Sequence, residues 1–274
     1  MSVFTKVSHA ELEAFLAQYD LGTLIGYTGI GEGIENTNYF VDTSRGRWVL
    51  TLFERLNYAD LPFFLGLMEH LARHGYPSAL PVASNEGLTL SMLNGKPAAL
   101  VARLTGQSVL FPNLMQCAAV GHALGELHKL TASYSGHCVN GRGAPWRSQT
   151  GELLLPRVSA GVRELIADEL DAQAKLKLDS LPQGVIHADL FKDNVLFVDD
   201  RLTGVIDFYY ACNDSLLYDL AITLNDWCAE PDGSRKPAKA AANDGGMGAP
   251  VSRLAGRRWM IDVCKHQLTV ETVI

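Results

Sequence analysis

The sequence HADLFKDN, from His187 to Asn194, and the short apolar stretch that leads on to Asp207 decide what kind of fold this chain adopts. Phosphoryl transfer needs a carboxylate that accepts or orients the proton of the acceptor hydroxyl, and oxygen ligands that hold Mg²⁺ against the phosphates. Asp189 supplies the first group, while Asn194 and Asp207 supply a neutral and a charged oxygen for a hard cation. The loop lies between expected short strands, so these residues can meet at neighbouring strand ends. The pattern therefore predicts an ATP-dependent kinase with Asp189 as the catalytic base.

The same acids also have a purely structural interpretation, in which Asp189 and Asp193 cap turns and Asp207 begins a loop. Each residue taken alone fits that interpretation about as well as the catalytic one. The spacing of the whole set, in its strand context, favours the kinase. Asp219, in the later sequence YDLA, is expected to cap or brace the catalytic loop.

The histidines near this pattern are predicted to be structural. His187 is expected to bond to nearby backbone and so to fix the loop. His128, in the sequence LHKL, is expected to pack or to bond locally on its helix. Neither residue is therefore assigned to the chemistry.

A glycine-rich segment, GIGEGIENTN from Gly29 to Asn38, is the second signal. Glycines let backbone amides approach phosphates, and polar side chains add donors near the same turn. The candidate nucleotide-binding residues in this segment are Gly31, Gly33, Asn36 and Asn38. Glycines also build ordinary hairpins, so the segment alone leaves both interpretations open. Neither the G-x-G-x-x-G spacing of a dinucleotide-binding fold nor the G-x-x-x-x-G-K-[ST] of a P-loop is present.

Hydrophobic periodicity and turn signals give the order of the elements. A capping box at Ser8–Glu11 predicts the first helix. Strands with turns at Ser44–Gly46 and Asn94–Gly95 follow, together with a helix over residues 60–74 that Asp60 can cap. After Gly106 the expected elements are helices over 115–130 and 151–180, strands over 184–187, 195–198 and 204–207, and a helix from about Leu217.

This order predicts an α+β fold with a bilobal plan and a ligand between the lobes. An antiparallel-sheet N-lobe is expected over residues 1–105 and a mostly helical C-lobe over residues 106–234. Residues 235–274 are a small-residue run interrupted by glycine and proline, and we expect this tail to be poorly packed.

Composition limits the partners. The net charge is −7 and the pI about 5.6, without a basic stripe, which argues against a nucleic-acid partner. No apolar run approaches the roughly 18 residues of a membrane span, and the first residues do not resemble a signal peptide. The 5 cysteines include no C-x-x-C pair, so reduced thiols in a cytoplasmic enzyme are expected. The oligomeric state is left open.

Three stretches resemble the bacterial homoserine kinase branch of the aminoglycoside phosphotransferase-like kinases, which share the protein-kinase fold. They are GIENTNYF at 33–40, VLTLFER at 49–55, and the catalytic stretch VIHADLFKDNVLF at 185–197, continued by IDFYYACND at 206–214 and LNDWC at 224–228. The resemblance runs to about Gly233. It implies ATP and Mg²⁺ as cofactors, L-homoserine as the small-molecule acceptor, and O-phospho-L-homoserine, on the route to threonine, as the product.

Two departures from the family pattern concern the nucleotide and the tail. Kinases of this fold carry an ATP-binding lysine on the third strand, and the matching position here is Thr51. Mg²⁺, the glycine-loop amides or a cation such as Arg55 must then neutralise more of the phosphate charge.

The segment Leu100–Leu104, with Arg103, is expected to be the hinge whose backbone contacts adenine. Beyond about residue 234 the sequence no longer resembles the family, so an aberrant or truncated C-terminus is expected.

An amino-acid acceptor needs an anion for its ammonium group and a cation for its carboxylate. Tyr209, Asp214 and Asp226 are the candidate acceptor-binding residues, and no arginine stands out for the carboxylate. The nearest alternative is another small-molecule kinase of this fold, for an aminoglycoside, choline or a sugar. The alternative from a different class is a nucleotide-binding module without turnover, because Thr51 and the tail could have cost activity.

Overall fold

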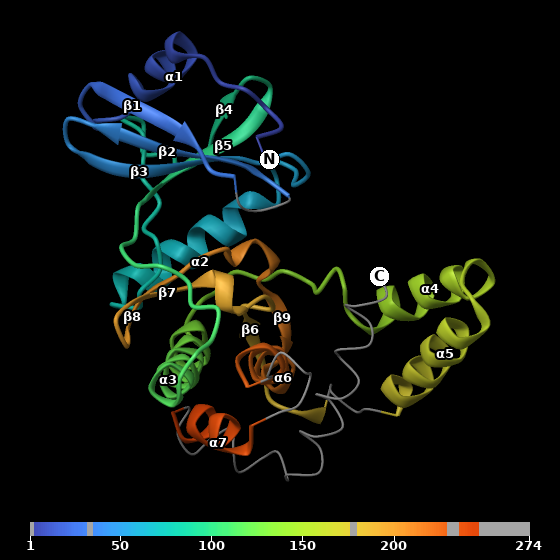
Figure 1. The fold of residues 1–274 in the computed structure, drawn as a ribbon. Helices are drawn as coiled ribbons and strands as arrows, with labels where there is room; N and C mark the ends of the chain where they lie inside the picture. Colours follow the sequence, from blue (N-terminus) through green and yellow to red (C-terminus); the bar gives the residue numbers. More distant parts are fainter. Residues whose placement is uncertain (1–2, 32–34, 176–179, 229–235, 247–274) are drawn as a thin grey trace. The chain divides into compact units, whose positions relative to one another are not determined.

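The computed structural model describes residues 3–31, 35–175, 180–228 and 236–246. The chain forms two compact units, Met1–Thr105 and Gly106–Ile274. Each unit has its own strands and helices, which Figure 1 colours along the sequence, and each is described by itself.

The first unit is built on an antiparallel sheet in the strand order β1-β2-β3-β5-β4. Its strands are β1 (Leu24–Gly29), β2 (Thr37–Thr43), β3 (Gly46–Leu52), β4 (Ser91–Leu93) and β5 (Lys96–Ala102). Asn94 and Gly95 connect β4 to β5 with positive φ angles of 50° and 74°. Two successive left-handed residues are what a type I′ turn requires, and this confirms the predicted hairpin.

Helix α1 (His9–Leu16) covers one part of this sheet's apolar core. It begins at the predicted capping box, in which the Ser8 side chain accepts from the Glu11 amide and Glu11 accepts from the Ser8 amide. Leu12 of α1 and Leu50 of β3 are fully enclosed in the same core. The local signal and the buried face therefore agree, and the predicted first helix is confirmed.

Helix α2 (Leu61–Arg73) is also where the sequence predicts it, with Pro62 in its first turn. Asp60 precedes the helix but makes no side-chain cap bond, which differs from the prediction. The reason is its backbone, which is already helical (φ −85°, ψ −26°) rather than extended as a capping residue requires.

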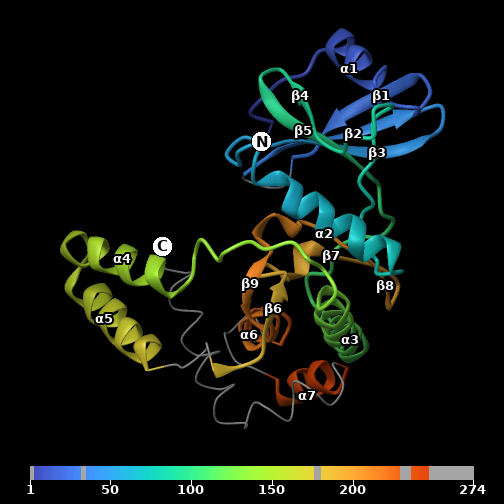
Figure 2. The same ribbon diagram turned by 180° about the vertical axis from the view of Figure 1, so that it is seen from behind.

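The described part of the second unit contains the helices α3 (Leu114–Thr131), α4 (Ala144–Leu154), α5 (Ala160–Ala174), α6 (Leu216–Trp227) and α7 (Pro237–Gly246). The single helical pattern expected over 151–180 is wrong, because α4 ends and α5 begins within it. Between them lies a 3₁₀ turn around Pro156, which has no N–H to donate and so interrupts the helix. Figures 1 and 2 show α4 and α5 side by side.

Two small antiparallel strand pairs frame the catalytic stretch. β6 (Gln183–Ile186) pairs with β9 (Cys212–Ser215), and β7 (Val195–Val198) pairs with β8 (Arg201–Val205). His187–Asn194 therefore runs from the end of β6 to the start of β7. This confirms the expectation that the loop lies between short strands.

Helix α7 corrects the first part of the expectation for the tail. It packs beside α3 (Figure 2), and its Asn243 is fully buried and donates from Nδ2 to the Cys117 carbonyl at 2.9 Å. A Cβ on Gly121 of α3 would collide with the Asn243 carbonyl. The small residues that suggested poor packing instead let two helices approach closely. Residues 247–274 lie outside the described residues, and for them the expectation stays a prediction.

Over the described ranges, no helix is both long and apolar enough to cross a membrane. The cysteines in those ranges, Cys117, Cys138, Cys212 and Cys228, are free thiols. A cytoplasmic location stays a prediction.

Candidate active site

The catalytic loop starts with a buried histidine that fixes its backbone. His187 is fully buried, its Nε2 lies 3.0 Å from the Ile206 carbonyl, and its Nδ1 accepts from the Asp189 amide at 3.2 Å. These contacts define a neutral ring with the proton on Nε2. Burial, which disfavours the charged form, lowers the pKa of His187 and keeps it neutral. The predicted structural role of His187 is therefore confirmed.

Asp189 and Asn194 are joined directly across the loop. Nδ2 of Asn194 donates to Oδ2 of Asp189 at 2.9 Å and to its carbonyl oxygen at 2.8 Å. Asn194 closes a short 3₁₀ turn and is buried, while Asp189 is only partly buried. Because the amide nitrogen faces Asp189, the Asn194 oxygen points away from that carboxylate. The loop thus offers an oriented carboxylate and, beside it, a neutral oxygen.

Asp207 lies at the same end of the β7–β8 pair as Asn194. Val195 pairs with Val205, and the Ile206 amide donates to the Asn194 carbonyl at 3.0 Å. Asp207 follows Ile206 with a left-handed backbone (φ 60°) and an exposed side chain. The strand register therefore brings the second carboxylate back to the loop, one residue beyond the point of contact.

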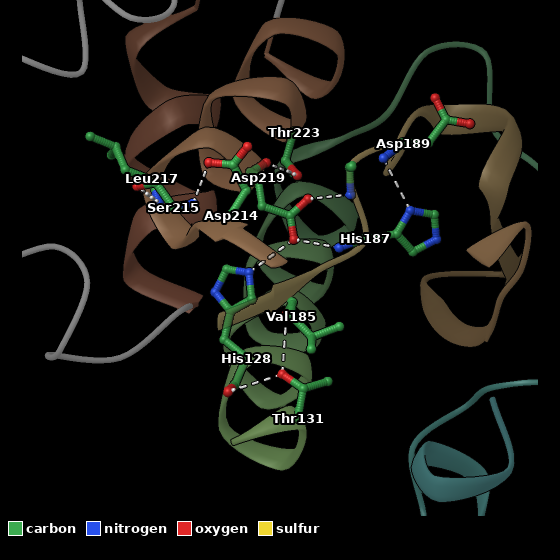
Figure 3. A network of polar contacts seen from close by, with 11 residues as sticks. His128, Thr131, Val185, His187, Asp189, Asp214, Ser215, Leu217, Asp219 and Thr223 are labelled. Atoms are coloured by element: carbon green, nitrogen blue, oxygen red, sulfur yellow. Dashed lines mark hydrogen bonds and ion pairs between the residues drawn. The ribbon is translucent and has the colours of Figure 1, made fainter. Parts of the chain in front are cut away.

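Helix α6 holds the backbone of this loop through the buried Asp219 (Figure 3). Oδ2 and Oδ1 of Asp219 accept from the amides of His187 and Ala188, both at 2.9 Å. Burial alone would raise the pKa of Asp219, but the hydrogen bond from His128 and the contacts of His187 hold it below its ordinary value. Asp219 therefore braces the loop as a carboxylate, as the sequence predicts.

Asp226 also contacts the loop, seven residues further along α6. Its Oδ2 accepts from the Lys192 amide at 2.7 Å, and its Oδ1 lies 3.4 Å from the Lys192 ammonium group. Burial raises the pKa of Asp226. Asp226, a candidate acceptor-binding residue, is therefore bonded to the catalytic loop itself.

The other two acceptor candidates lie on either side of the start of β9. Tyr209 belongs to the 3₁₀ turn Phe208–Tyr210, directly after Asp207. Asp214 pairs with Gly184 on β6. Its Oδ2 accepts from Nδ2 of Asn140 at 2.6 Å, and its Oδ1 accepts from the Ser215 amide. Figure 3 shows it beside Ser215, at the foot of α6. Tyr209 is therefore close to Asp207 in the chain, and Asp214 lies further along β9.

Three nucleotide candidates of the first unit, Asn38, Thr51 and Arg103, lie on β2, on β3 and just beyond β5. Asn38 and Thr51 are register partners, and the Thr51 hydroxyl donates to Oδ1 of Asn38 at 2.7 Å. Thr51 is buried, and its hydroxyl orients the side-chain amide of Asn38. Kinases of this fold are expected to carry a charged lysine at this position. Gly31 and Asn36 lie within the glycine-rich segment, and Gly33 lies outside the described residues.

Arg103 lies just beyond β5, within the segment predicted as the hinge. Its guanidinium stacks 4.0 Å over the ring of Phe40, and its amide donates to the Arg47 carbonyl at 3.2 Å. In the same segment, Leu100 and Ala102 exchange backbone hydrogen bonds with residues 80–82 as well as with β3. The hinge role of this segment stays a prediction.

The donor set suits a hard cation that is shared with phosphates. Within residues 3–31, 35–175, 180–228 and 236–246, no group of three or more His, Cys, Asp or Glu side chains could hold a metal ion by itself. Asn194 and Asp207 offer one neutral and one charged oxygen at one end of a strand pair. Mg²⁺ in kinases is bound in this way, by one or two protein oxygens with phosphates and waters completing the shell. The residues therefore fit a nucleotide-dependent magnesium site.

Fold and loop together define a phosphotransferase, and sequence comparison agrees. Residues 26–253 match the family model described as the phosphotransferase enzyme family, so the chain belongs to that family. The match extends past residue 234, where the resemblance was expected to end. The extension to residue 253 includes all of α7.

Within that family the chain belongs with the homoserine kinases. It is 49% identical over 232 residues to the homoserine kinase of Methylobacillus flagellatus, covering 85% of this chain and 73% of that protein. It is 48% identical over 246 residues to the homoserine kinase of Xanthobacter autotrophicus, covering 88% and 77%. The predicted branch is therefore confirmed.

Solved structures support the fold class. An amicoumacin kinase in complex with AMP-PNP, Ca²⁺ and Ami superimposes with a TM-score of 0.75 at 14% identity, over 97% of this chain and 85% of that one. The predicted α+β, protein-kinase-like fold is confirmed.

Sequence reasoning missed two features of the site. His128, expected to bond locally, instead contacts Asp219, which is 91 positions away. Arg142, which no sequence motif singles out, has its guanidinium against Tyr210 in the turn after Asp207. No local pattern marks either residue, because both contacts join segments far apart in the chain.

Proposed function

We propose that this chain transfers the γ-phosphate of ATP to the side-chain hydroxyl of L-homoserine, forming O-phospho-L-homoserine and ADP on the route to threonine. The observation that carries the proposal is the Asp189–Asn194 pairing, which orients a partly buried carboxylate at the head of the loop. The relatives named homoserine kinase support the choice of acceptor.

Asp189 is the proposed catalytic base. As the acceptor oxygen forms its bond to the γ-phosphorus, its proton passes to the Asp189 carboxylate, and the bond to the bridging oxygen of ADP breaks. Asn194 keeps the carboxylate in one orientation. His187 and Asp219 hold the backbone on which it sits, so little reorganisation is needed during the reaction.

Asn194 and Asp207 are the proposed Mg²⁺ ligands. Asn194 would present its side-chain oxygen, because its nitrogen is bonded to Asp189, and Asp207 would present its carboxylate. A bound Mg²⁺ would neutralise charge on the phosphates as the leaving group departs.

The first unit is proposed to bind the nucleotide. Amides around Gly31 and Gly33, with Asn36 and Asn38, would contact the phosphates, and the Leu100–Leu104 segment with Arg103 would contact the adenine end. Thr51 fixes Asn38 through its hydroxyl and carries no charge of its own. Phosphate charge is then left to Mg²⁺ and to the backbone amides.

Tyr209 and Asp214 remain proposed acceptor residues. For Asp226 we favour a role in holding the loop, because its carboxylate is bonded to the Lys192 amide. An acceptor's ammonium group would then depend on another anion, and Asp214 is the candidate on β9.

A coupled ADP-release assay with ATP and Mg²⁺ tests the proposal directly. The panel contains L-homoserine, choline, an aminoglycoside and a hexose, each at the same concentration. We expect turnover with L-homoserine to exceed the others by at least about tenfold in kcat/KM, since each 1.4 kcal/mol of discrimination gives that factor. Preferred turnover of any other member, or no turnover with any, would reject homoserine as the acceptor.

A further inference from the structure

The segment that leads into α4 is attached to β9. The amide of Cys138 donates to Oδ1 of Asn213 at 2.9 Å, and the Asn213 amide donates to the Cys138 carbonyl at 2.7 Å. Two residues later, Asn140 donates to Asp214 at 2.6 Å. The segment is thus held against β9. Strand β9 pairs with β6, and β6 leads into the catalytic loop.

This attachment brings Arg142 onto Tyr210. Nη2 of Arg142 donates to the Tyr210 hydroxyl at 2.9 Å, and the guanidinium lies 4.5 Å from the centre of the tyrosine ring. The Arg142 amide also donates to Oδ1 of Asn140 at 2.8 Å. Main chain and side chain of the arginine are therefore both held in place.

Strand register puts Tyr210 beside the catalytic loop. Ile186 is the last register partner on β6, and it pairs with Cys212 on antiparallel β9. The residues just before Cys212 and the residues just after Ile186, which begin the loop, therefore leave the same end of this strand pair, and the ring centres of His187 and Phe208 lie 4.6 Å apart. Tyr210 also closes the turn that starts after Asp207. A guanidinium held by Tyr210 therefore belongs to the surroundings of the loop.

Arg147, the other arginine of this region, has a different role. It is buried, and its nitrogens donate to Gln173 at 2.7 Å, to the Arg142 carbonyl at 3.1 Å and to the Tyr218 hydroxyl at 3.4 Å. Arg147 thus ties α4 to α5 and α6 and supports the backbone of Arg142. Arg142 itself is exposed, so its charge is the one that a ligand from solvent meets.

We propose that Arg142, seated on Tyr210, binds the carboxylate of the amino-acid acceptor, an inference that rests on the proposed function. A planar guanidinium offers two parallel N–H donors that match a carboxylate, and stacking on a ring fixes its plane. Choline and aminoglycosides are cations without a carboxylate, so the same charge disfavours them. Arg142 is then a specificity residue that selects a zwitterionic amino alcohol over the acceptors of other kinases with this fold.

Steady-state kinetics on three acceptors test this role. They are L-homoserine, 3-aminopropan-1-ol, which lacks the carboxylate, and 4-hydroxybutanoate, which lacks the ammonium group. Arg142→Ala is expected to raise KM for L-homoserine and 4-hydroxybutanoate roughly 10- to 100-fold, the usual loss for a charge-assisted pair. KM for 3-aminopropan-1-ol and for ATP should stay within about twofold. Arg142→Lys should lie between, because it keeps the charge and loses the planar fork.

Arg201→Ala is the matched control, since Arg201 is an exposed arginine of the same unit on β8. It should leave all four KM values unchanged. Wild-type turnover of L-homoserine with an Arg142→Ala KM within about threefold of wild type would overturn the inference and leave the proposed function standing. An equal rise in KM for all three acceptors would overturn it too, since that is the mark of a structural defect. A wild-type protein that does not phosphorylate L-homoserine would reject the proposed function first.

Discussion

Nε2 of His128 lies 2.9 Å from Oδ2 of Asp219, and both side chains are almost completely buried. The contact joins α3 to α6, and the same Asp219 oxygen also accepts from the His187 amide. Among the described residues, Nδ1 of His128 has no hydrogen-bond partner, which indicates that the ring carries its proton on Nε2 and donates to the aspartate. Helix α3 thereby helps to set the position of the catalytic loop.

Asp219→Asn is expected to lower both stability and turnover. The carboxylate accepts three hydrogen bonds, and an amide must turn its NH₂ group toward one of those donors. Losing one partner of a buried charged network costs about 3–5 kcal/mol. Displacement of the loop should lower kcat on the order of 10²-fold. Urea unfolding and steady-state kinetics measure the two effects.

Thr223→Val is the control for that variant. Its hydroxyl donates to the Asp219 carbonyl within α6 and does not touch the loop, so about 1 kcal/mol of stability should be lost with kcat unchanged. If Asp219→Asn behaved in the same way, the helix would not be positioning the loop.

Asp226→Asn should change how stability depends on pH. Burial raises the folded-state pKa of Asp226 above its ordinary value of 3.8, so the folded protein binds this proton more tightly than the unfolded chain. The stability contributed by this group is fully present below the unfolded pKa and is lost as pH rises through the folded pKa. Asparagine keeps an oxygen for the Lys192 amide and has no charge to bury. The variant should therefore gain on wild type as pH rises from about 4.

Urea unfolding of both proteins at a series of pH values between about 4 and 7 measures that difference. Asp168→Asn, at an exposed position on α5, serves as the control for removal of a surface carboxylate. A constant gap between Asp226→Asn and wild type across the series would mean that burial does not perturb this carboxyl.

Asp189→Asn should abolish most turnover while ATP binding persists. Loss of a positioned base costs about 10²–10⁴ in rate. Asp193→Asn serves as the control, because it removes a carboxylate from the same loop at an exposed position. A kcat for Asp189→Asn within about threefold of wild type would remove Asp189 from the mechanism.

Asp207→Asn should weaken Mg²⁺-dependent nucleotide binding. Asparagine is the appropriate replacement, because the backbone at this position is left-handed (φ 60°), which asparagine tolerates better than alanine. Removing one anionic ligand should raise the Mg²⁺ concentration needed for half-maximal activity by about tenfold or more. Titration of Mg²⁺ at fixed ATP measures it, and an unchanged metal dependence would contradict the ligand assignment.

Gly121→Ala should separate α7 from α3. The new Cβ would meet the Asn243 carbonyl, and overpacking of this kind costs about 1–3 kcal/mol. Gly161→Ala on α5 is the control, since a Cβ there meets nothing within 4 Å and should be neutral or stabilising by up to about 1 kcal/mol. Hydrogen exchange over residues 237–246 reports the outcome. Equal protection in the two variants would show that the helices are not closely packed at Gly121.

Features that depend on neighbouring residues were predictable from the amino-acid sequence. The Ser8–Glu11 capping box, the Asn94–Gly95 hairpin and the loop between β6 and β7 each follow from side chains that act within a few positions of their own backbone. Local conformational preference decides such features, so the order of elements and the kinase-like loop could be predicted before any packing was known.

The tertiary structure alone decided which distant side chains meet. His128 reaches Asp219 across 91 positions, Arg142 reaches Tyr210 across 68, and Asp226 turns to the loop at Lys192. The same holds for α7. Its small residues suggested poor packing from the sequence, but in the structure Gly121 of α3 lies against Asn243 and lets the two helices pack closely. Partners of this kind are chosen by how helices and strands pack. A polar or small residue carries no local sign of the element it will face, because its own backbone conformation is the same whichever partner it finds.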